Sequence, residues 1–388
     1  MRSKLLAVAA ISVFTSMATG LAYSQAQMVQ AKVAMTDSSA AALATTKRVA
    51  ISNVMVSFQA SVGGDKTNTS GLFAAKSDAS SALQMPVMDT QLLATITDDI
   101  HQQLKADLQA NGFEVLPEAT VLASSAYKKI IAMAGISNFS KFANMNGDVV
   151  LVGASGLKPY LPYNAETGKF GQPTKSLIND WISRMGGKSS TEGGPSSITI
   201  AEIYALPGLE VDMCKELNAH VVKATYVVTL GSTKSAVERF TGTHQDIRGN
   251  TGFSSTHTGN AYAQVGLLAG QSRIAFRTSA AKTGGESSSG SYTANFGNNA
   301  PAAKDGNVVV TLAESLAGGS DFFSLAGGEK KDGGVGSFLF GKVLGGTGAD
   351  TQFEFTASIS DPAAYRAEVV GMVKQAQRDM LVLVKQTW

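Results

Sequence analysis

The sequence predicts a mixed α/β protein. Its strands alternate with helices to form a sheet with helices on its faces, elaborated by antiparallel strands and a C-terminal helix. First, strand-like and helix-like runs alternate between residues 48 and 230. Parallel strands need a crossover connection, which is usually a helix, so this order favours an α/β sheet. Second, the chain from about residue 237 reads as short strands between Gly and Ser turns. Third, an amphipathic segment closes the chain.

The beginning of the chain has the order of residues typical of a secretory signal peptide. Arg2 and Lys4 are followed by a mostly apolar run over 5–22 and then by small and polar residues. Ser, Thr and Gly within the run make it too polar and short for a good membrane span. The alternative, an uncleaved N-terminal anchor, is therefore disfavoured.

Small residues at alternate positions place the predicted cleavage after Ser24 or Ala26. We therefore expect a signal peptide over 1–26, a flexible lead over 27–47 and export to the periplasm.

The composition fits an exported, strand-rich protein. The 388-residue chain is 44% hydrophobic and only 16% charged, whereas about a quarter of the residues of an average soluble domain are charged. Loss of Arg2 and Lys4 from the 32 basic residues leaves 30, which balance the 30 acidic ones. Net charge therefore gives no attraction to nucleic acid or to anionic lipid.

Cys214 is the single cysteine of the sequence. An intramolecular disulfide and a cysteine-based zinc site are therefore not expected. Cys214 lies in a helical-looking stretch, and we expect it to be buried and inert. The alternative, a reactive or intermolecular thiol, lacks a neighbouring His or basic cluster that would stabilise a thiolate.

The predicted α/β domain spans 48–236, and its clearest element is a helix over 89–111. Apolar residues recur there every four positions and make one stripe, and Asp89 or Thr90 can cap the start. The stripe consists of Leu92, Leu93, Ile96, Ile100, Leu104 and Leu108. The other predicted elements are strands over 48–58, 113–116, 148–153 and 219–230, helices over 118–134 and 198–217, and loop insertions over 59–86 and 157–197.

The predicted β-rich part spans 237–360, and the terminal helix spans 361–388. The helix has a buried stripe that includes Tyr365, Val369 and Val384. The strands predicted in the β-rich part cover 237–246, 262–268, 273–278, 292–296, 308–312 and 352–359.

Four histidines are the candidates for imidazole chemistry. We expect His101 on the polar side of its helix and His220 at the start of its strand. His244 and His257 lie near Asp246, which is a conceivable His/His/Asp metal site, but no spacing fixes these residues on one face. Solvated loop histidines are therefore the favoured interpretation. The sequence also lacks the common nucleophile, zinc-protease, P-loop and dinucleotide motifs, so no catalytic, cofactor-binding or metal-binding residue is predicted.

The Gly-rich stretch 315–350 contains Ser-Leu-Ala-Gly-Gly twice, at 315–319 and at 324–328. In the same stretch, 345–350 matches the first six positions of a calcium-binding nonapeptide repeat. Calcium repeats of this kind need several consecutive copies, and only one partial copy occurs here. An ordinary Gly-rich loop or hairpin is therefore favoured over a calcium site, and no cofactor is expected.

Several segments carry a resemblance to a known family. Arg48–Val54 is similar to a strand of the type K/R-V-A-V-x-x-F, Leu92–Leu108 is the following helix, and Asn111–Leu116 is similar to the segment that ends it. Gly147–Gly153 is similar to a later A-D-x-V-V-x-G strand, and Ala219–Val228 offers a second one. Together these segments resemble the α/β domain of the curli-secretion-channel (CsgG-like) proteins, a form shared with the N-terminal domain of TolB.

This resemblance covers about 48–230 and rests on motifs of the fold. It implies a protein of the Gram-negative cell envelope, in the periplasm or at the outer membrane. The lipidated N-terminal cysteine of that family is absent, and the insertions 59–86 and 157–197 are long for a minimal domain. The membrane-inserting hairpins of the family therefore do not transfer residue by residue.

We therefore expect an exported, non-enzymatic cell-envelope protein. It would be a secretion or assembly accessory, or a protein-interaction module, that associates with itself or with protein partners, without nucleic acid, and with the outer membrane as one location. Two alternatives stay open: a periplasmic hydrolase with a site on the loops 157–197 and 240–300, and an outer-membrane pore or adhesin. A ring-forming assembly predicts a large oligomer, whereas an enzyme predicts a concave pocket with perturbed titratable groups.

Overall fold

The computed structural model describes residues 31–35, 39–71, 74–142, 148–160, 163–164, 169–170, 200–245, 251–279, 307–330 and 350–386. The predicted signal peptide and the first part of the predicted lead lie outside the described residues, as does most of the insertion predicted over 157–197. From Ala31 on, the chain belongs to one compact unit.

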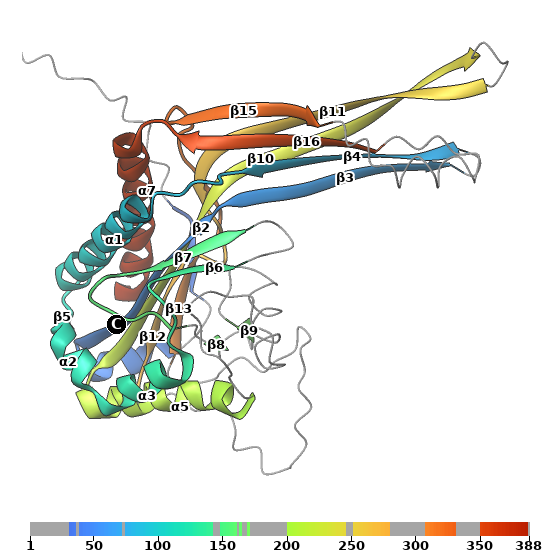
Figure 1. Ribbon diagram of the computed structural model, residues 1–388. Helices are drawn as coiled ribbons and strands as arrows, with labels where there is room; N and C mark the ends of the chain where they lie inside the picture. The colour runs from blue at the N-terminus through green and yellow to red at the C-terminus, as the bar shows by residue number, and fades with distance from the viewer. Residues whose placement is uncertain are drawn as a thin grey trace, which may run out of the picture. The chain divides into compact units, whose positions relative to one another are not determined.

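The unit is built around a large mixed sheet with two parallel strands, β2 and β10, at its centre (Figure 1). β2, Arg48–Gln59, is buried along nearly its whole length because its Val, Ile, Met and Phe side chains face covered surfaces on both sides. β10, His220–Gln245, pairs with β2 from His220 to Val228. Across the sheet the order is β1 (Val33–Met35), β13 (Asn307–Leu312), β12 (Arg273–Arg277), β10, β2, β7 (Val149–Gly153) and β6 (Phe139–Phe142), with β5 (Glu114–Val115) also pairing with β2.

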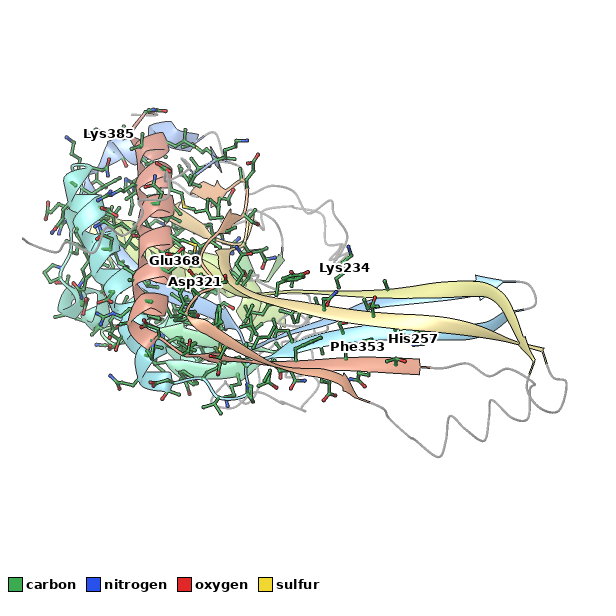
Figure 2. The ribbon with its side chains drawn as sticks, turned by 90° about the horizontal axis from the view of Figure 1, so that it is seen from above. Lys234, His257, Asp321, Phe353, Glu368 and Lys385 are labelled. Carbon is green, nitrogen blue, oxygen red and sulfur yellow. The ribbon has the colours of Figure 1, made fainter. Side chains whose placement is uncertain are left out.

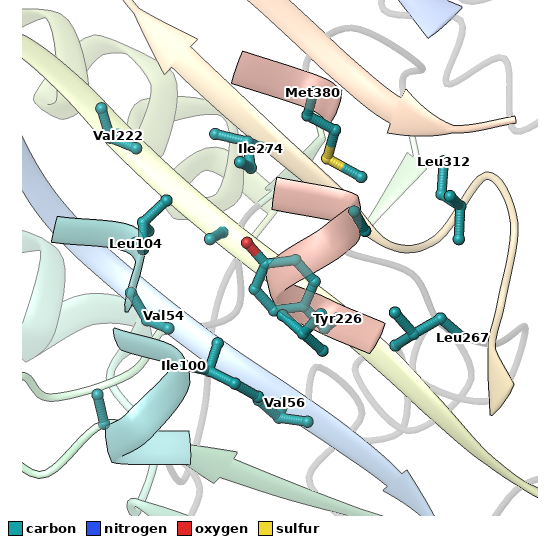
Figure 3. Close-up of a cluster of buried hydrophobic side chains, with 14 of the residues drawn as sticks. Val54, Val56, Ile100, Leu104, Val222, Tyr226, Leu267, Ile274, Leu312 and Met380 are labelled. Atoms are coloured by element: carbon teal, nitrogen blue, oxygen red, sulfur yellow. The ribbon is translucent and has the colours of Figure 1, made fainter. Parts of the chain in front are cut away.

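Helices cover both faces of this sheet. α1, Thr90–Ala110, and α7, Pro362–Lys385, share one buried cluster with β2 and β10. Figure 3 shows this core, in which Ile100, Leu104 and Met380 face the sheet residues Val54, Val56, Val222, Tyr226 and Ile274. The opposite face is covered by α2 (Glu118–Ala123), α3 (Ser125–Ala134) and α5 (Ile200–Leu217). The predicted mixed α/β class is thereby confirmed.

The predicted first helix is confirmed as α1. The Asp89 side chain accepts hydrogen bonds from the backbone N–H groups of Gln91 and Leu92, so Asp89 is the cap. The predicted every-fourth residues from Ile96 to Leu108 are buried, and only in the first turn does Leu93 take the buried position while Leu92 is half-buried. Burial of this stripe, rather than helix propensity alone, holds the helix on the sheet.

The strict alternation of strands and helices is not found, and the predicted loop over 59–86 is corrected. These residues form a hairpin of β3, Ser61–Gly71, and β4, Ala74–Gln84. Gly, Ser, Asp and Asn carry no apolar alternation, so the pattern gave no strand signal. The backbone ladder of the hairpin forms nonetheless.

Three further boundaries differ from the prediction. β10 runs without a break across the boundary predicted at 236/237, and β11, Thr251–Leu267, is longer than the strand predicted there. The helix predicted over 118–134 is divided into α2 and α3 at Ser124, whose hydroxyl caps α3 by accepting from Tyr127 N–H. Glu216 of α5 also accepts hydrogen bonds at this helix start, from the backbone N–H groups of Ser125 and Ala126.

A second sheet adjoins the first. Its order is β15 (Phe323–Lys330), β16 (Asp350–Ile359), β4 and β3. β16 and β4 are parallel and the other two pairs are antiparallel. The strand predicted over 352–359 is confirmed as β16, the strand predicted over 292–296 lies outside the described residues, and so does most of the partial calcium repeat.

The outer part of the β10–β11 hairpin packs on this second sheet. Figure 2 labels Lys234 of β10, His257 of β11 and Phe353 of β16 along these strands. The Ser81 hydroxyl donates to the carbonyl of Lys234 at 3.3 Å, and a Cβ added at Gly259 would collide with the Phe353 ring. Small residues at the interface therefore let the two layers approach closely. The buried apolar cluster between them consists of Leu83, Met85, Leu230, Ala261 and Ala357.

Candidate functional site

His101 is buried, which corrects the expectation that it lies on the polar side of its helix, and His220 begins β10 as predicted and is also buried. His101 of α1 is 2% exposed, and its Nε2 lies 3.8 Å from Glu118 Oε1. Burial and the neighbouring Lys105 lower the pKa of His101. His220 is 1% exposed, with its Nε2 3.2 Å from the carbonyl oxygen of Leu43, and burial lowers its pKa.

The other two histidines lie apart on one hairpin. His257 of β11 is opposite Val237, whereas His244 of β10 is opposite Gly252. Along β11, His257 lies five residues from Gly252, the residue opposite His244, and five residues of strand span about 17 Å. These histidines therefore do not share a metal site, and Asp246 lies outside the described residues. Within the described part of the chain, no group of three or more metal-ligating side chains comes together.

Cys214 is buried in α5, as its sequence context predicts. Its Sγ donates to the carbonyl oxygen of Arg277 at 3.2 Å, and burial raises the pKa of the thiol to about 12. At neutral pH the group is a thiol and not a thiolate, which makes it a poor nucleophile and metal ligand.

The sequence analysis missed a buried cluster of charged side chains between α5 and the sheet. Glu210 of α5 is 1% exposed, and its carboxylate accepts hydrogen bonds from two cationic side chains. Lys223 Nζ of β10 lies 2.9 Å from Glu210 Oε1, and Arg277 Nε of β12 lies 3.0 Å from Glu210 Oε2. Lys223 interrupts an otherwise apolar strand, and such an interruption is the one sequence signal that indicates a buried partner.

A hydroxyl pair extends this cluster across β2. Tyr160 is fully buried; its OH donates to Glu210 Oε1 at 3.3 Å and shares a 2.8 Å hydrogen bond with the Ser52 hydroxyl. Burial raises the pKa of Tyr160 well above its usual value, and the Glu210 charge adds to this effect. Tyr160 is therefore a neutral hydroxyl at all physiological pH values.

The electrostatics of this cluster indicate a structural and not a catalytic role. Burial raises the pKa of Glu210, but Lys223 and Arg277 lower it more, so the carboxylate is charged. A general acid or base needs a pKa near the working pH. The pKa of Glu210 is lowered and the pKa of Tyr160 is raised, so both pKa values lie far from the working pH. The cluster joins α5 to β10 and β12.

The second candidate site lies on a group of strands that we call the distal strands: β3, β4, β15, β16 and the outer parts of β10 and β11. Some of these strands have an open edge. β10 pairs with β11 alone, among the described strands, beyond Gly231. β3 pairs only with β4, and β15 only with β16, within the same described set. Open edges present rows of backbone N–H and C=O groups that can pair with another chain.

Comparison with known proteins assigns this chain to no family. A scan against protein-family models finds no match, and searches of curated proteins and of solved structures find no significant similarity. Among the described helices, none is long and apolar enough to cross a membrane.

Proposed function

We propose that this protein is an exported, non-enzymatic assembly protein of the cell envelope, and that it works by associating with further copies of itself through its distal strands. The proposal places the protein in the periplasm or at the outer membrane, consistent with the predicted signal peptide. It also retains the proposed likeness between the α/β part and the CsgG-like domain.

The observation that carries this proposal is the length of open strand edge. β3 covers 11 residues and β15 covers 8, and in the described chain each pairs with one strand only. The outer edge of β3 is occupied at its first residue, where Ser61 N–H donates to the carbonyl of Asp148. Soluble proteins usually shorten, charge or cover such edges, because an open edge invites pairing with another chain. The long open edges of this protein therefore favour a function in which they pair with another chain.

The chemistry of the described side chains supports a non-enzymatic role. The four histidines are dispersed, and Cys214 is a buried thiol with a raised pKa. The charged cluster at Glu210 holds its groups in fixed protonation states. Of the loops proposed to carry a hydrolase site, most of 157–197 and part of 240–300 lie outside the described residues, and no observation on the described part favours that alternative.

The proposal is tested by measuring the mass of the native protein. Light scattering on the detergent-extracted, size-fractionated protein is expected to give a multiple of the chain mass well above a dimer. The full chain has a mass of 40.2 kDa. A mass of one chain at all concentrations tested would refute assembly as the function.

A further inference from the structure

We propose that the outer face of the β10–β11 hairpin binds the glycan strands of peptidoglycan. We call this surface the Tyr262 face, and it consists of the exposed side chains Ser232, Lys234, Thr258, Asn260, Tyr262 and Gln264. The inference goes beyond assembly, because it concerns the side chains of the hairpin and leaves the strand edges free. It rests on the proposed function only for the periplasmic location, which determines the polysaccharide that the protein meets.

The alternation of side chains along the hairpin gives it two different faces. Ser235 and Ala261 are buried against the second sheet, where the Ser235 hydroxyl donates to the carbonyl of Ala79 at 3.3 Å. The side chains between them point the opposite way, and in Figure 2 Lys234 points away from Phe353 of β16. The second sheet therefore supports the hairpin from behind and holds its outer face in place.

Tyr262 lies at the centre of this face. It is 60% exposed, and the other exposed large apolar residues of the described chain are aliphatic. No hydrogen bond or ring contact joins the Tyr262 side chain to any other described residue. Tyrosine combines a large apolar ring with a hydroxyl, and it binds ligands at a low cost in conformational entropy because it has only two side-chain torsions. The ring is therefore available to stack on a ligand.

Polar side chains surround this ring on both strands. Ser232 of β10 is directly opposite Tyr262. Asn260 and Gln264 each lie two positions from Tyr262 on β11, which is about 7 Å along the strand, and neighbouring strands are about 5 Å apart. The Gln264 amide is fixed by a 2.9 Å hydrogen bond from its Nε2 to the carbonyl of Gly318. Hydroxyl and amide groups thus lie on both sides of one aromatic ring.

This arrangement is complementary to a saccharide. A sugar ring has an apolar face of C–H groups and a rim of polar groups, so an aromatic ring can cover the face while neighbouring donors and acceptors bind the rim. Lys234, which is opposite Asn260, adds one positive charge. Peptidoglycan is a polymer of N-acetylated sugars whose side groups carry carboxylates. Its amides match the amides of the Tyr262 face, and its carboxylates complement the charge of Lys234.

The composition of the Tyr262 face favours a polysaccharide over other macromolecules. Nucleic acids and anionic membranes are held by several cations, and Lys234 is the single charged residue of the face. A protein partner normally buries a core of several apolar side chains, and this face offers Tyr262 alone. A small ligand would need a concave pocket. A polysaccharide has none of these requirements, because it can lie along an exposed pair of strands.

Co-sedimentation of the purified full-length protein with isolated sacculi tests the role of Tyr262. We expect Tyr262→Ala to weaken binding about tenfold or more, because it removes the central aromatic contact. Tyr262→Trp keeps an aromatic ring and should retain binding. Leu122→Ala is the matched control, because Leu122 is 40% exposed on α2, and this variant should bind like the wild type. Circular dichroism and light scattering check that all variants keep the fold and the native mass.

The chemistry of the ligand is tested on sacculi from which an amidase has removed the peptides. This treatment leaves the glycan strands, so we expect binding to survive and to be inhibited by soluble N-acetylglucosamine oligomers. Binding that is lost with the peptides, or Tyr262-dependent binding to phosphatidylglycerol vesicles, would overturn the inference. No binding by the wild type, or equal binding by Tyr262→Ala, would also overturn it and leave the native mass of the proposed assembly unaffected. A monomeric wild type that binds through Tyr262 would overturn assembly alone.

Discussion

At the scale of single residues, the buried ion pairs of Glu210 with Lys223 and Arg277 can be tested by mutation. Glu210→Gln removes the charge that compensates Lys223 and Arg277, and breaking a buried ion pair typically costs about 3–5 kcal/mol. We expect a loss of that order in the free energy of unfolding, measured by urea titration. Glu114→Gln is the control. It breaks the exposed pair with Arg48, whose atoms are 3.4 Å apart, and should cost less than about 1 kcal/mol. Equal losses in the two variants would contradict the buried cluster.

The buried His101 predicts how stability changes with pH. Its pKa is lowered in the folded protein relative to the usual 6.5, chiefly by burial and Lys105, with Glu118 and Asp98 acting in the opposite direction. The unfolded chain therefore binds a proton more readily. The stability that His101 contributes is complete above pH 6.5 and is lost as the pH falls through the lowered value.

We therefore expect the free energy of unfolding to decrease between pH 7.5 and pH 5, and to decrease less steeply in His101→Asn. The measurement is urea unfolding at a series of pH values. An identical slope in the two proteins would show that His101 is not buried as described.

At the scale of elements, α1 tests whether its stripe holds it to the sheet. Leu104 is fully buried, and Leu104→Ala should cost about 2–5 kcal/mol of unfolding free energy. Gln102 is exposed on the same helix, and Gln102→Ala should change that energy by less than about 0.5 kcal/mol. Lys105, which follows Leu104, is unsuitable as a control because it forms an ion pair with Glu118. Similar losses from both changes would refute the amphipathic assignment.

The elements that sequence could predict are those whose burial leaves a periodic trace. α1 and α7 bury one face each, and β2 is a mostly apolar run without Gly or Pro, so their patterns are visible without a structure. The β3–β4 hairpin is made of small and polar residues and is held by its backbone ladder, which no side-chain period records. The second sheet could not be predicted either, because it joins β4 to β16 across more than 250 residues of sequence.

The candidate sites follow the same division. The burial of Cys214 could be predicted from its helical context. The Glu210 cluster could not, because Glu210 looks like an exposed helix position in sequence and its two cations come from two different strands, 13 and 67 residues further along the chain. Lys223, a charge within an apolar strand, was the available signal. The free edges of β3 and β15 are properties of strand order, which a single sequence does not determine.

At the scale of the whole molecule, export is a prediction that stands apart from the fold. The basic, apolar and small-residue order of the first 26 residues predicts removal of this segment. N-terminal sequencing of the protein recovered from the periplasm should begin at Gln25 or Gln27. A mature protein that still carries Met1 would contradict the predicted cleavage.

The most direct test of assembly through strand edges is hydrogen exchange of the distal strands, measured by mass spectrometry on the native, detergent-extracted protein. Pairing between copies would place the outer backbone N–H groups of β3 and β15 in hydrogen bonds and slow their exchange. We expect peptides covering 64–71 and 323–330 to exchange slowly in the wild type. They should exchange at least tenfold faster in Leu325→Lys, which places a charge on a β15 side chain that is 44% exposed, with α1 unchanged. Equal and rapid exchange of both edges in the two proteins, together with the mass of a single chain, would contradict the account.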